Sequence, residues 1–206
     1  MSISQTFIFT GGGTGGHVTP ALALAEGVRK NHPDAHFAYV GVRGKAEESM
    51  VNKAWAQELG NGLASLHFVR SRGFLGISMS IIPFGVDLIL GILKSVFILL
   101  RLRPQAIIAT GGYVSAPILF ASYFLQKIRL LNTKIFLHEQ NAVLGKMNKV
   151  AVRFSDRVGV AFPGTKVSAK KKAFVGYPVR GSVVMDSNED KDKLRREARD
   201  SLKIPQ

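Results

Sequence analysis

The 206-residue sequence contains no cysteine. A disulfide framework, a thiolate metal site and a cysteine nucleophile are therefore excluded, and the composition is typical of a protein in a reducing compartment. The first residues also lack the cationic segment that opens an export signal, so we expect no export. No internal repeat is present.

Acidic residues are scarce, with 14 Asp and Glu against 28 Lys and Arg. The formal net charge of +14 predicts anionic partners, namely phosphate groups, nucleic acid or an acidic membrane surface. We expect no nucleic acid, because few aromatic residues are interleaved with the basic ones and no known binding module is present. Charged residues make up only 20% and apolar residues 46%, which excludes a disordered chain.

No uninterrupted apolar run reaches the roughly 18 residues that argue for a membrane-spanning helix. The most apolar segment, residues 77–102, is interrupted by Asp87, Lys94 and Arg101, so we expect it not to span a membrane. Asp87 is the one acid between residues 59 and 138, where the basic residues are Arg70, Arg72, Lys94, Arg101, Arg103, Lys127, Arg129 and Lys134. Beside the apolar residues of 74–84, these cations fit a protein that lies on anionic lipid, and equally a buried helix with a solvated basic end.

Short apolar runs alternate with longer helical patterns, which predicts an α/β protein: a Rossmann-like parallel sheet with helices on both faces. The expected strands are residues 6–10, 36–42, 65–69, 105–109, 134–138 and 157–160. The expected helices are residues 19–31, 46–57, 80–101, 115–126 and 144–154. Thr19 is expected to cap the first helix, with Pro20 in its first turn. Ligand-binding loops of such a sheet follow the carboxyl ends of its strands.

Two glycine-rich segments follow expected strands. Residues 11–17 read GGGTGGH and precede the first helix, where backbone N–H groups and the helix dipole can receive an anion. They formally match G-x-G-x-x-G, but the second strand ends without the acid that a dinucleotide site needs, and no Walker A sequence is present. Residues 111–115 read GGYVS, so both loops are expected to face one cleft; the alternative is a pair of glycine turns without a ligand.

Polar side chains follow the strand at residues 134–138. His138, Glu139, Gln140 and Asn141 stand together there, and each alone could be a satisfied polar residue of the core. Their convergence on one rim favours a site. Residues 176–180 read GYPVR and add a rigid turn that carries Arg180.

The motifs at residues 12–17, 111–117, 138–141, 161–163 and 176–180 together resemble the amino-terminal half of the MurG family. Members of that family add N-acetylglucosamine to the lipid-linked muramyl-pentapeptide precursor of peptidoglycan. The resemblance covers most of residues 5–182. Tyr177 departs from it, because the family usually has Asn there, and the chain stops where the family's second half would begin.

The resemblance implies the amino-terminal domain of a two-domain (GT-B type) glycosyltransferase that uses no metal and no cofactor. Residues 1–182 are expected to be the acceptor-binding Rossmann-like domain, and residues 183–206 a charged linker or helix leading to an absent donor-binding domain. The residues expected to reach the donor UDP-N-acetylglucosamine, most of whose contacts the absent domain supplies, are Thr14, Gly15, Gly16, Asn141 and Arg180. Gly111, Gly112 and Tyr113 are expected to bind substrate on the second loop. The glycines of both loops, residues 11–16 and 111–112, are expected to capture the acceptor's diphosphate.

His17 is the candidate base for the acceptor hydroxyl, because imidazole exchanges protons readily near neutral pH. Glu139 is its rival, either as the base or as the group that orients another side chain. The expected location is peripheral, on the cytoplasmic face of the bacterial inner membrane, and the chain alone is expected to be inactive. Two alternatives are a non-catalytic membrane-recruiting subunit of a split glycosyltransferase and a basic nucleotide-binding Rossmann protein.

Overall fold

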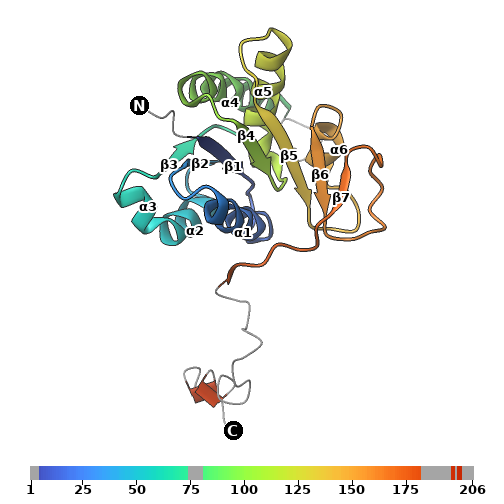
Figure 1. The fold of residues 1–206 in the computed structure, drawn as a ribbon. Coiled ribbons are helices and arrows are strands. Elements are labelled where there is room, and N and C mark those ends of the chain that lie inside the picture. Colours follow the sequence, from blue (N-terminus) through green and yellow to red (C-terminus); the bar gives the residue numbers. More distant parts are fainter. Residues whose placement is uncertain (1–4, 74–80, 182–195, 198, 201–206) are drawn as a thin grey trace.

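Seven parallel strands form one sheet in the order β3-β2-β1-β4-β5-β6-β7 (Figure 1). The computed structural model describes residues 5–73, 81–181, 196–197 and 199–200. The strands are β1 (Thr6–Thr10), β2 (His36–Gly41), β3 (Ala64–Phe68), β4 (Ala106–Ala109), β5 (Lys134–Glu139), β6 (Arg157–Val160) and β7 (Lys172–Phe174). β2 and β3 follow β1 on one side of it, and β4 to β7 lie on its other side. The strand order therefore reverses between β1 and β4. The predicted α/β fold is confirmed.

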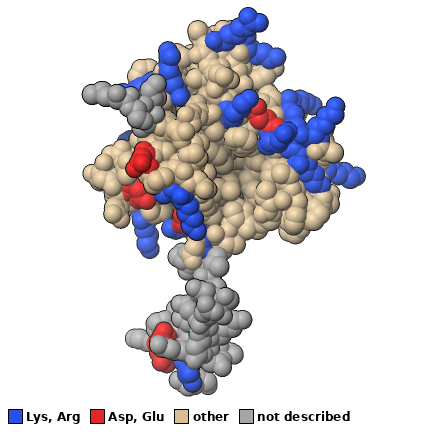
Figure 2. All heavy atoms as spheres, viewed as in Figure 1, with Lys and Arg blue, Asp and Glu red and all other residues tan. Residues whose placement is uncertain are grey.

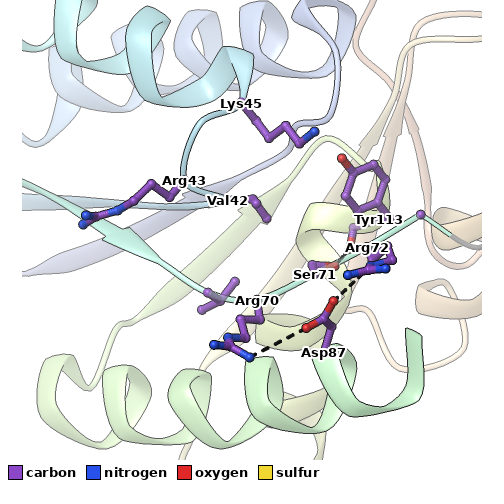
Figure 3. Close-up of a pocket in the computed structure, with 10 residues that line it drawn as sticks. Val42, Arg43, Lys45, Arg70, Ser71, Arg72, Asp87 and Tyr113 are labelled. Atoms are coloured by element: carbon purple, nitrogen blue, oxygen red, sulfur yellow. Dashed lines mark hydrogen bonds and ion pairs between the residues drawn. The ribbon is translucent and has the colours of Figure 1, made fainter. Parts of the chain in front are cut away.

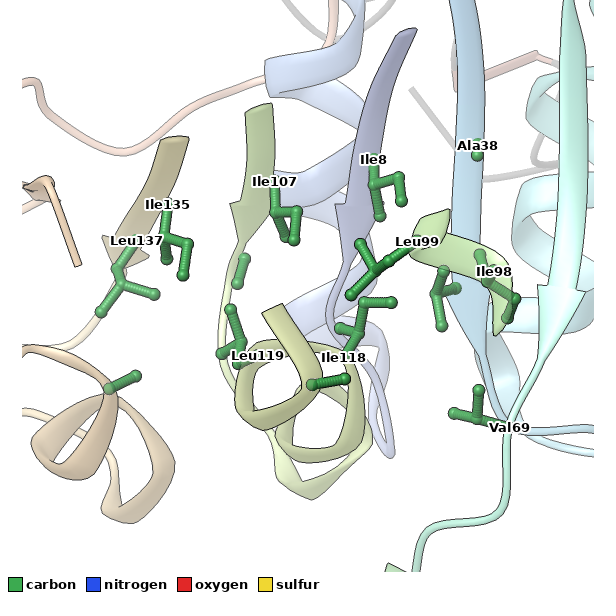
Figure 4. Packing of buried hydrophobic residues seen from close by; sticks show 14 of the residues in the cluster. Ile8, Ala38, Val69, Ile98, Leu99, Ile107, Ile118, Leu119, Ile135 and Leu137 are labelled. Atoms are coloured by element: carbon green, nitrogen blue, oxygen red, sulfur yellow. The ribbon is translucent and has the colours of Figure 1, made fainter. Parts of the chain in front are cut away.

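Helices cover both faces of the sheet. They are α1 (Gly15–Asn31), α2 (Ala46–Ala54), α3 (Ala56–Gly60), α4 (Ile81–Leu102), α5 (Ala116–Lys127) and α6 (Lys146–Ala151), with a short 3-10 turn, η1 (Tyr113–Ser115), before α5. Alternating side chains of each strand enter two cores. Phe7 and Phe9 pack with α1 and Trp55, whereas Ile8 packs with residues of α4 and α5 (Figure 4).

The start of α1 corrects a prediction. The helix begins at Gly15, with Thr14 at its cap position, so Thr19 and Pro20 lie inside it rather than at its start. The glycine loop itself starts the helix, because the His17 amide already donates to the Thr14 carbonyl at 3.2 Å. Pro20 has no N–H for the carbonyl four residues earlier, and the Gly16 carbonyl is therefore free to accept from another group.

Of the other boundaries, those of β1 and β6 agree with the prediction, and most of the rest differ by one residue. The helix expected at 46–57 is divided at Trp55 into α2 and α3, and the one expected at 144–154 is the shorter α6. β7 is missing from the prediction, because its three residues, none of them buried, carry no clear strand pattern. Phe74, Leu75, Ile77 and Met79, and most of the expected linker at 183–206, lie outside the described residues.

α4 is long and apolar enough to cross a membrane by length and composition alone. One side of it is buried: Gly91 is so close to the preceding chain that a Cβ there would meet the Arg70 carbonyl oxygen at 2.1 Å, and Leu99 is fully buried. The other side exposes Ile89, Leu93 and Phe97. The helix is thus held on the sheet beside α5, and no other described element covers its apolar face. That it does not span a membrane stays a prediction.

Candidate functional site

The two glycine-rich loops meet at the carboxyl ends of β1 and β4, where the strand order reverses. Gly13, Gly111 and Gly112 have positive φ angles of 84°, 94° and 80°, which L side chains rarely adopt. A Cβ on Gly112 would lie 2.3 Å from the Gly12 carbonyl oxygen, so the loops touch through their backbones. Ligands of open parallel sheets bind at such a reversal point, and the prediction that both loops face one cleft is consistent with this contact.

A cavity of about 510 Å³ opens beside these loops. Five of the predicted site residues line it, namely His17, Gly111, Gly112, Tyr113 and Glu139. Its opposite wall is largely apolar and comes from α4, α5 and α6, with Phe84, Leu88, Phe120, Met147 and Val150. The cavity therefore offers a few polar groups on one side and an apolar surface on the other, as small-molecule sites commonly do.

His17 stands in the first turn of α1 with one ring nitrogen already engaged. Its Nδ1 lies 2.9 Å from the Thr110 carbonyl oxygen. A carbonyl only accepts, so this contact assigns the ring proton to Nδ1, and the Nε2 lone pair has no hydrogen-bond donor among the described residues. His17 can therefore take a proton from a hydroxyl group that enters the cavity.

Gln140, which directly follows β5, contacts the same Thr110 carbonyl and His17 ring. Its Nε2 donates to the Thr110 carbonyl at 3.0 Å and approaches the Gly16 carbonyl at 3.4 Å, the carbonyl that Pro20 leaves free. The amide also lies against His17 Nδ1. Because two N–H groups cannot bond each other, we assign the Nδ1 proton to His17 and the two Gln140 hydrogens to the Thr110 and Gly16 carbonyl oxygens. The sequence placed Gln140 on the rim without assigning it a role.

Glu139 is buried and fully engaged. Its Oε1 accepts from the backbone N–H and the side-chain amide of Asn141, both at 3.0 Å. Its Oε2 accepts from the Gly145 N–H at 2.8 Å and from Asn148 Nδ2 at 2.9 Å. These four donors occupy its lone pairs, so of the two roles expected for Glu139 its contacts favour orientation of its neighbours.

Asn148 lines the cavity and Glu47 supports the first glycine loop, although no sequence motif marks either residue as functional. Asn148 Nδ2 donates to His138 and Glu139, which leaves its buried Oδ1 without a partner among the described residues, next to Gly111. Glu47 is fully buried and accepts from the Gly13 and Val42 N–H groups at 3.2 and 3.0 Å. Glu47 thus fixes the first glycine loop. The one available signal in the sequence was the spacing of Glu47 four residues before Val51, which places both on the same side of a helix.

The predicted donor contacts are not gathered in this cavity. Thr14, Gly16 and Asn141 are exposed and Gly15 is half-buried, and none of the four lines the cavity. Arg180 lies elsewhere: its Nε pairs with Glu26 Oε1 on α1 at 2.6 Å, and the Gly181 N–H donates to Glu26 Oε2 at 2.9 Å. The segment after β7 is therefore tied to α1.

Basic residues outnumber acidic ones in the chain, 28 to 14. Figure 2 shows more basic than acidic side chains on the viewed face, with a group over the edge formed by α6, β6 and β7. Burial, together with the negative charge of Glu47, raises the pKa of Tyr113, so its phenol stays a hydrogen-bond donor at neutral pH. Among the described residues no cluster of three or more His, Asp or Glu side chains could hold a metal ion.

Residues 7–160 match the model of the glycosyltransferase family 28 N-terminal domain. Two relatives are named UDP-N-acetylglucosamine–N-acetylmuramyl-(pentapeptide) pyrophosphoryl-undecaprenol N-acetylglucosamine transferase. The one from Desulforudis audaxviator is 33% identical over 205 residues, which are 96% of this chain and 48% of the relative. The one from Listeria monocytogenes is 36% identical over 178 residues, which are 85% of this chain and 45% of the relative. The chain thus spans about half the length of the curated relatives it matches.

Two solved structures share the fold. MurG of Acinetobacter baumannii gives a TM-score of 0.63 at 24% identity, over 82% of this chain and 44% of that one. Medicago truncatula UGT71G1 complexed with UDP-glucose gives a TM-score of 0.55 at 11% identity, over 96% and 57% of the two chains. At these identities the likeness shows a shared fold alone.

Proposed function

Because the chain belongs to the family of glycosyltransferase family 28 N-terminal domains, we propose that it is the acceptor-binding half of an inverting N-acetylglucosamine transferase of peptidoglycan synthesis. Its resemblance to the MurG family, predicted from five motifs, is confirmed by relatives of 33% and 36% identity. The proposed acceptor is the lipid-linked muramyl-pentapeptide, and the proposed donor is UDP-N-acetylglucosamine. A second half, not contained in these 206 residues, would supply most of the donor contacts.

The observation that carries this proposal is the free Nε2 lone pair of His17 beside two glycine loops. The C4 hydroxyl of the muramyl sugar attacks the anomeric carbon of the donor sugar, and the bond from that carbon to UDP breaks with inversion. His17 Nε2 takes the hydroxyl proton as the new bond forms. The N–H groups of the loops and of the first turn of α1 receive the acceptor's diphosphate.

The exposed side of α4 supports a peripheral place on the cytoplasmic face of the bacterial inner membrane. Ile82, Ile89, Leu93 and Phe97 are each more than half exposed along one side of this helix. A monomeric soluble domain rarely leaves such a contiguous apolar strip in water. Because Phe84 and Leu88 of the same helix line the cavity, a lipid-linked acceptor would reach the site directly from the membrane surface.

A basic nucleotide-binding protein is less well supported. Arg43 follows the end of β2, where a dinucleotide site needs an acid for the ribose, and the nearby Glu47 is buried and engaged with Gly13 and Val42. No observation on the described residues favours a non-catalytic subunit over a catalytic half.

Replacement of His17 tests the proposed chemistry. In this chain fused to the carboxyl-terminal half of the Desulforudis audaxviator relative, His17→Ala should lower kcat by about a hundredfold or more, the usual contribution of a general base. His32→Ala is the matched control, because this half-exposed histidine at the end of α1 lies at the opposite end of the helix. Near-normal turnover of folded His17→Ala would assign the proton to another group.

A further inference from the structure

A second hollow, of about 620 Å³, lies on the other side of Tyr113, at the carboxyl ends of β2 and β3 (Figure 3). We call it the basic pocket; it is lined by Val42, Arg43, Lys45, Val69, Arg70, Ser71, Arg72, Gly73, Asp87 and Tyr113. Ser71, Arg72, Gly73 and Tyr113 also line the cavity that contains His17. The two hollows are therefore neighbours that share one wall.

The basic pocket has four cations and a single carboxylate. Asp87 on α4 lies 3.0 Å from Arg72 Nε and 4.0 Å from Arg70 Nη1, as the dashed lines of Figure 3 mark. Arg43 lies over the Phe68 ring at 4.8 Å, and neither it nor Lys45 has an acidic partner in the described part of the chain. One acid cannot neutralise four cations, so the hollow attracts anions.

The cations stand on a rigid support rather than on a free loop. Ser71 Oγ donates to the Tyr113 carbonyl at 2.7 Å, which ties the segment after β3 to the second glycine loop. The Arg70 backbone packs directly against Gly91 of α4. On the other side, Glu47 fixes Val42 and the first glycine loop. Pre-arranged guanidinium groups of this kind suit carboxylates, which they can bind through two parallel hydrogen bonds.

We propose that the basic pocket binds the carboxylates of the acceptor's pentapeptide, an inference that rests on the proposed function. In a muramyl sugar the peptide is attached through the lactyl ether at C3, next to the C4 hydroxyl. With the C4 hydroxyl at His17 Nε2, we place the start of the peptide against Tyr113, because Tyr113 lines both hollows. Five extended residues span about 17 Å, enough to pass Tyr113 and place acidic groups among Arg43, Lys45 and Arg70.

Phosphate is the other anion that such cations could take, and binding to the 206-residue chain separates the two. Three probes are titrated at low salt: a lactoyl-pentapeptide with free carboxylates, its fully amidated form, and inorganic diphosphate. Backbone amide NMR shifts report where each one binds. We expect the free acid to shift residues 42–45 and 70–73 and the amidated form to leave them unchanged. Diphosphate is expected to act at residues 11–16.

Arg43→Gln with Lys45→Gln should weaken binding of the free-acid peptide by about tenfold and leave diphosphate binding unchanged. Lys53→Gln with Lys166→Gln removes the same charge from exposed positions outside both hollows and serves as the control. Shifts of residues 42–45 and 70–73 by diphosphate alone, or no response to the free-acid peptide, would overturn the proposal. Diphosphate binding at the glycine loops would survive that outcome, so the proposed function is tested separately.

Discussion

The proton on His17 is controlled by a few contacts between distant residues. Thr110 Oγ1 donates to the His17 backbone carbonyl at 2.6 Å, and the Thr110 carbonyl accepts from both His17 Nδ1 and Gln140. These contacts hold the His17 ring, which lines the cavity beside Gly111 and Gly112, in one orientation. A histidine can accept a proton at Nε2 only while its own ring proton is on Nδ1, so the hydrogen bond at Nδ1 determines whether Nε2 can act as a base.

Gln140→Met keeps the shape of the side chain and removes its two donors. We expect the His17 ring to lose its uniform Nδ1–H form, since the Gly16 and Thr110 carbonyls lose a donor and the ring is free to rotate. Long-range ¹H–¹⁵N NMR of the imidazole nitrogens reports this directly, and kcat of the fused enzyme should fall about tenfold with little change in KM. Gln57→Met, on the exposed side of α3, is the control; an unchanged Nδ1–H form in folded Gln140→Met would contradict this role.

His138 makes the stability of the domain dependent on pH. Burial lowers the pKa of His138, outweighing its contact with the Gly176 carbonyl and the charge of Glu139, which raise it. The unfolded chain then binds the proton more readily than the folded one. The contribution of neutral His138 to the free energy of unfolding is therefore fully present above about pH 6.5 and is lost as the pH falls below that value.

The urea midpoint of the wild-type chain should therefore decrease between pH 7 and pH 5, and His138→Gln should show a smaller decrease. Burial lowers the pKa of His36 and His67 in the same direction, so part of the pH dependence should persist in the variant. An equal decrease in both proteins would exclude a contribution from His138.

Among the secondary-structure elements, α4 combines two roles that conflict in water. Its small residues Gly91 and Ser95 allow close packing on the domain, with Ser95 Oγ donating to the Gly91 carbonyl at 2.8 Å. Its opposite side exposes apolar side chains that gain free energy when a membrane surface covers them.

Ile89→Ser with Leu93→Ser should release the chain from anionic vesicles in a sedimentation assay. Each lost apolar side chain removes roughly 1 to 2 kcal/mol of burial in the lipid, enough together for a tenfold or greater loss of binding. Phe174→Ser with Val175→Ser alters two similarly exposed apolar residues near the other edge of the sheet and should bind like wild type. If the wild-type chain does not bind such vesicles at low salt, the apolar face of α4 is not a lipid-binding surface.

For the whole molecule, we expect these 206 residues to catalyse no sugar transfer by themselves. Holding the donor carbon and the acceptor hydroxyl in reactive geometry contributes roughly 7 to 11 kcal/mol, and a single wall of the site cannot hold both. The isolated chain should bind the acceptor weakly and UDP-N-acetylglucosamine hardly at all, as isothermal titration calorimetry would show. The second half of a relative, added in trans, should restore activity if the two cores fold independently. Product formation by the chain alone would overturn this assignment.

Local pattern was sufficient for most of the fold. The bounds of β1 and β6 agree with the prediction, because short apolar runs between turn residues report a buried parallel strand without reference to their neighbours. The start of α1 was misplaced, since Thr19-Pro20 is a strong local start signal that the tertiary contacts of the glycine loop override. The glycines of both loops were identifiable because a backbone with positive φ restricts the residue type itself.

The chemistry of the site depended on contacts that no local pattern contains. His17 and Thr110 are 93 positions apart, and Gln140 lies 123 positions from His17, so only folding reveals which ring nitrogen is free. The four donors to Glu139 and the ion pair of Arg180 with Glu26 likewise became visible through the packing of separate elements. The sequence alone determined which residue types border the carboxyl edge of the sheet, because strand and loop order places them there. The tertiary structure decided which of them are already engaged by neighbours, because hydrogen bonds depend on distances that sequence separation does not encode.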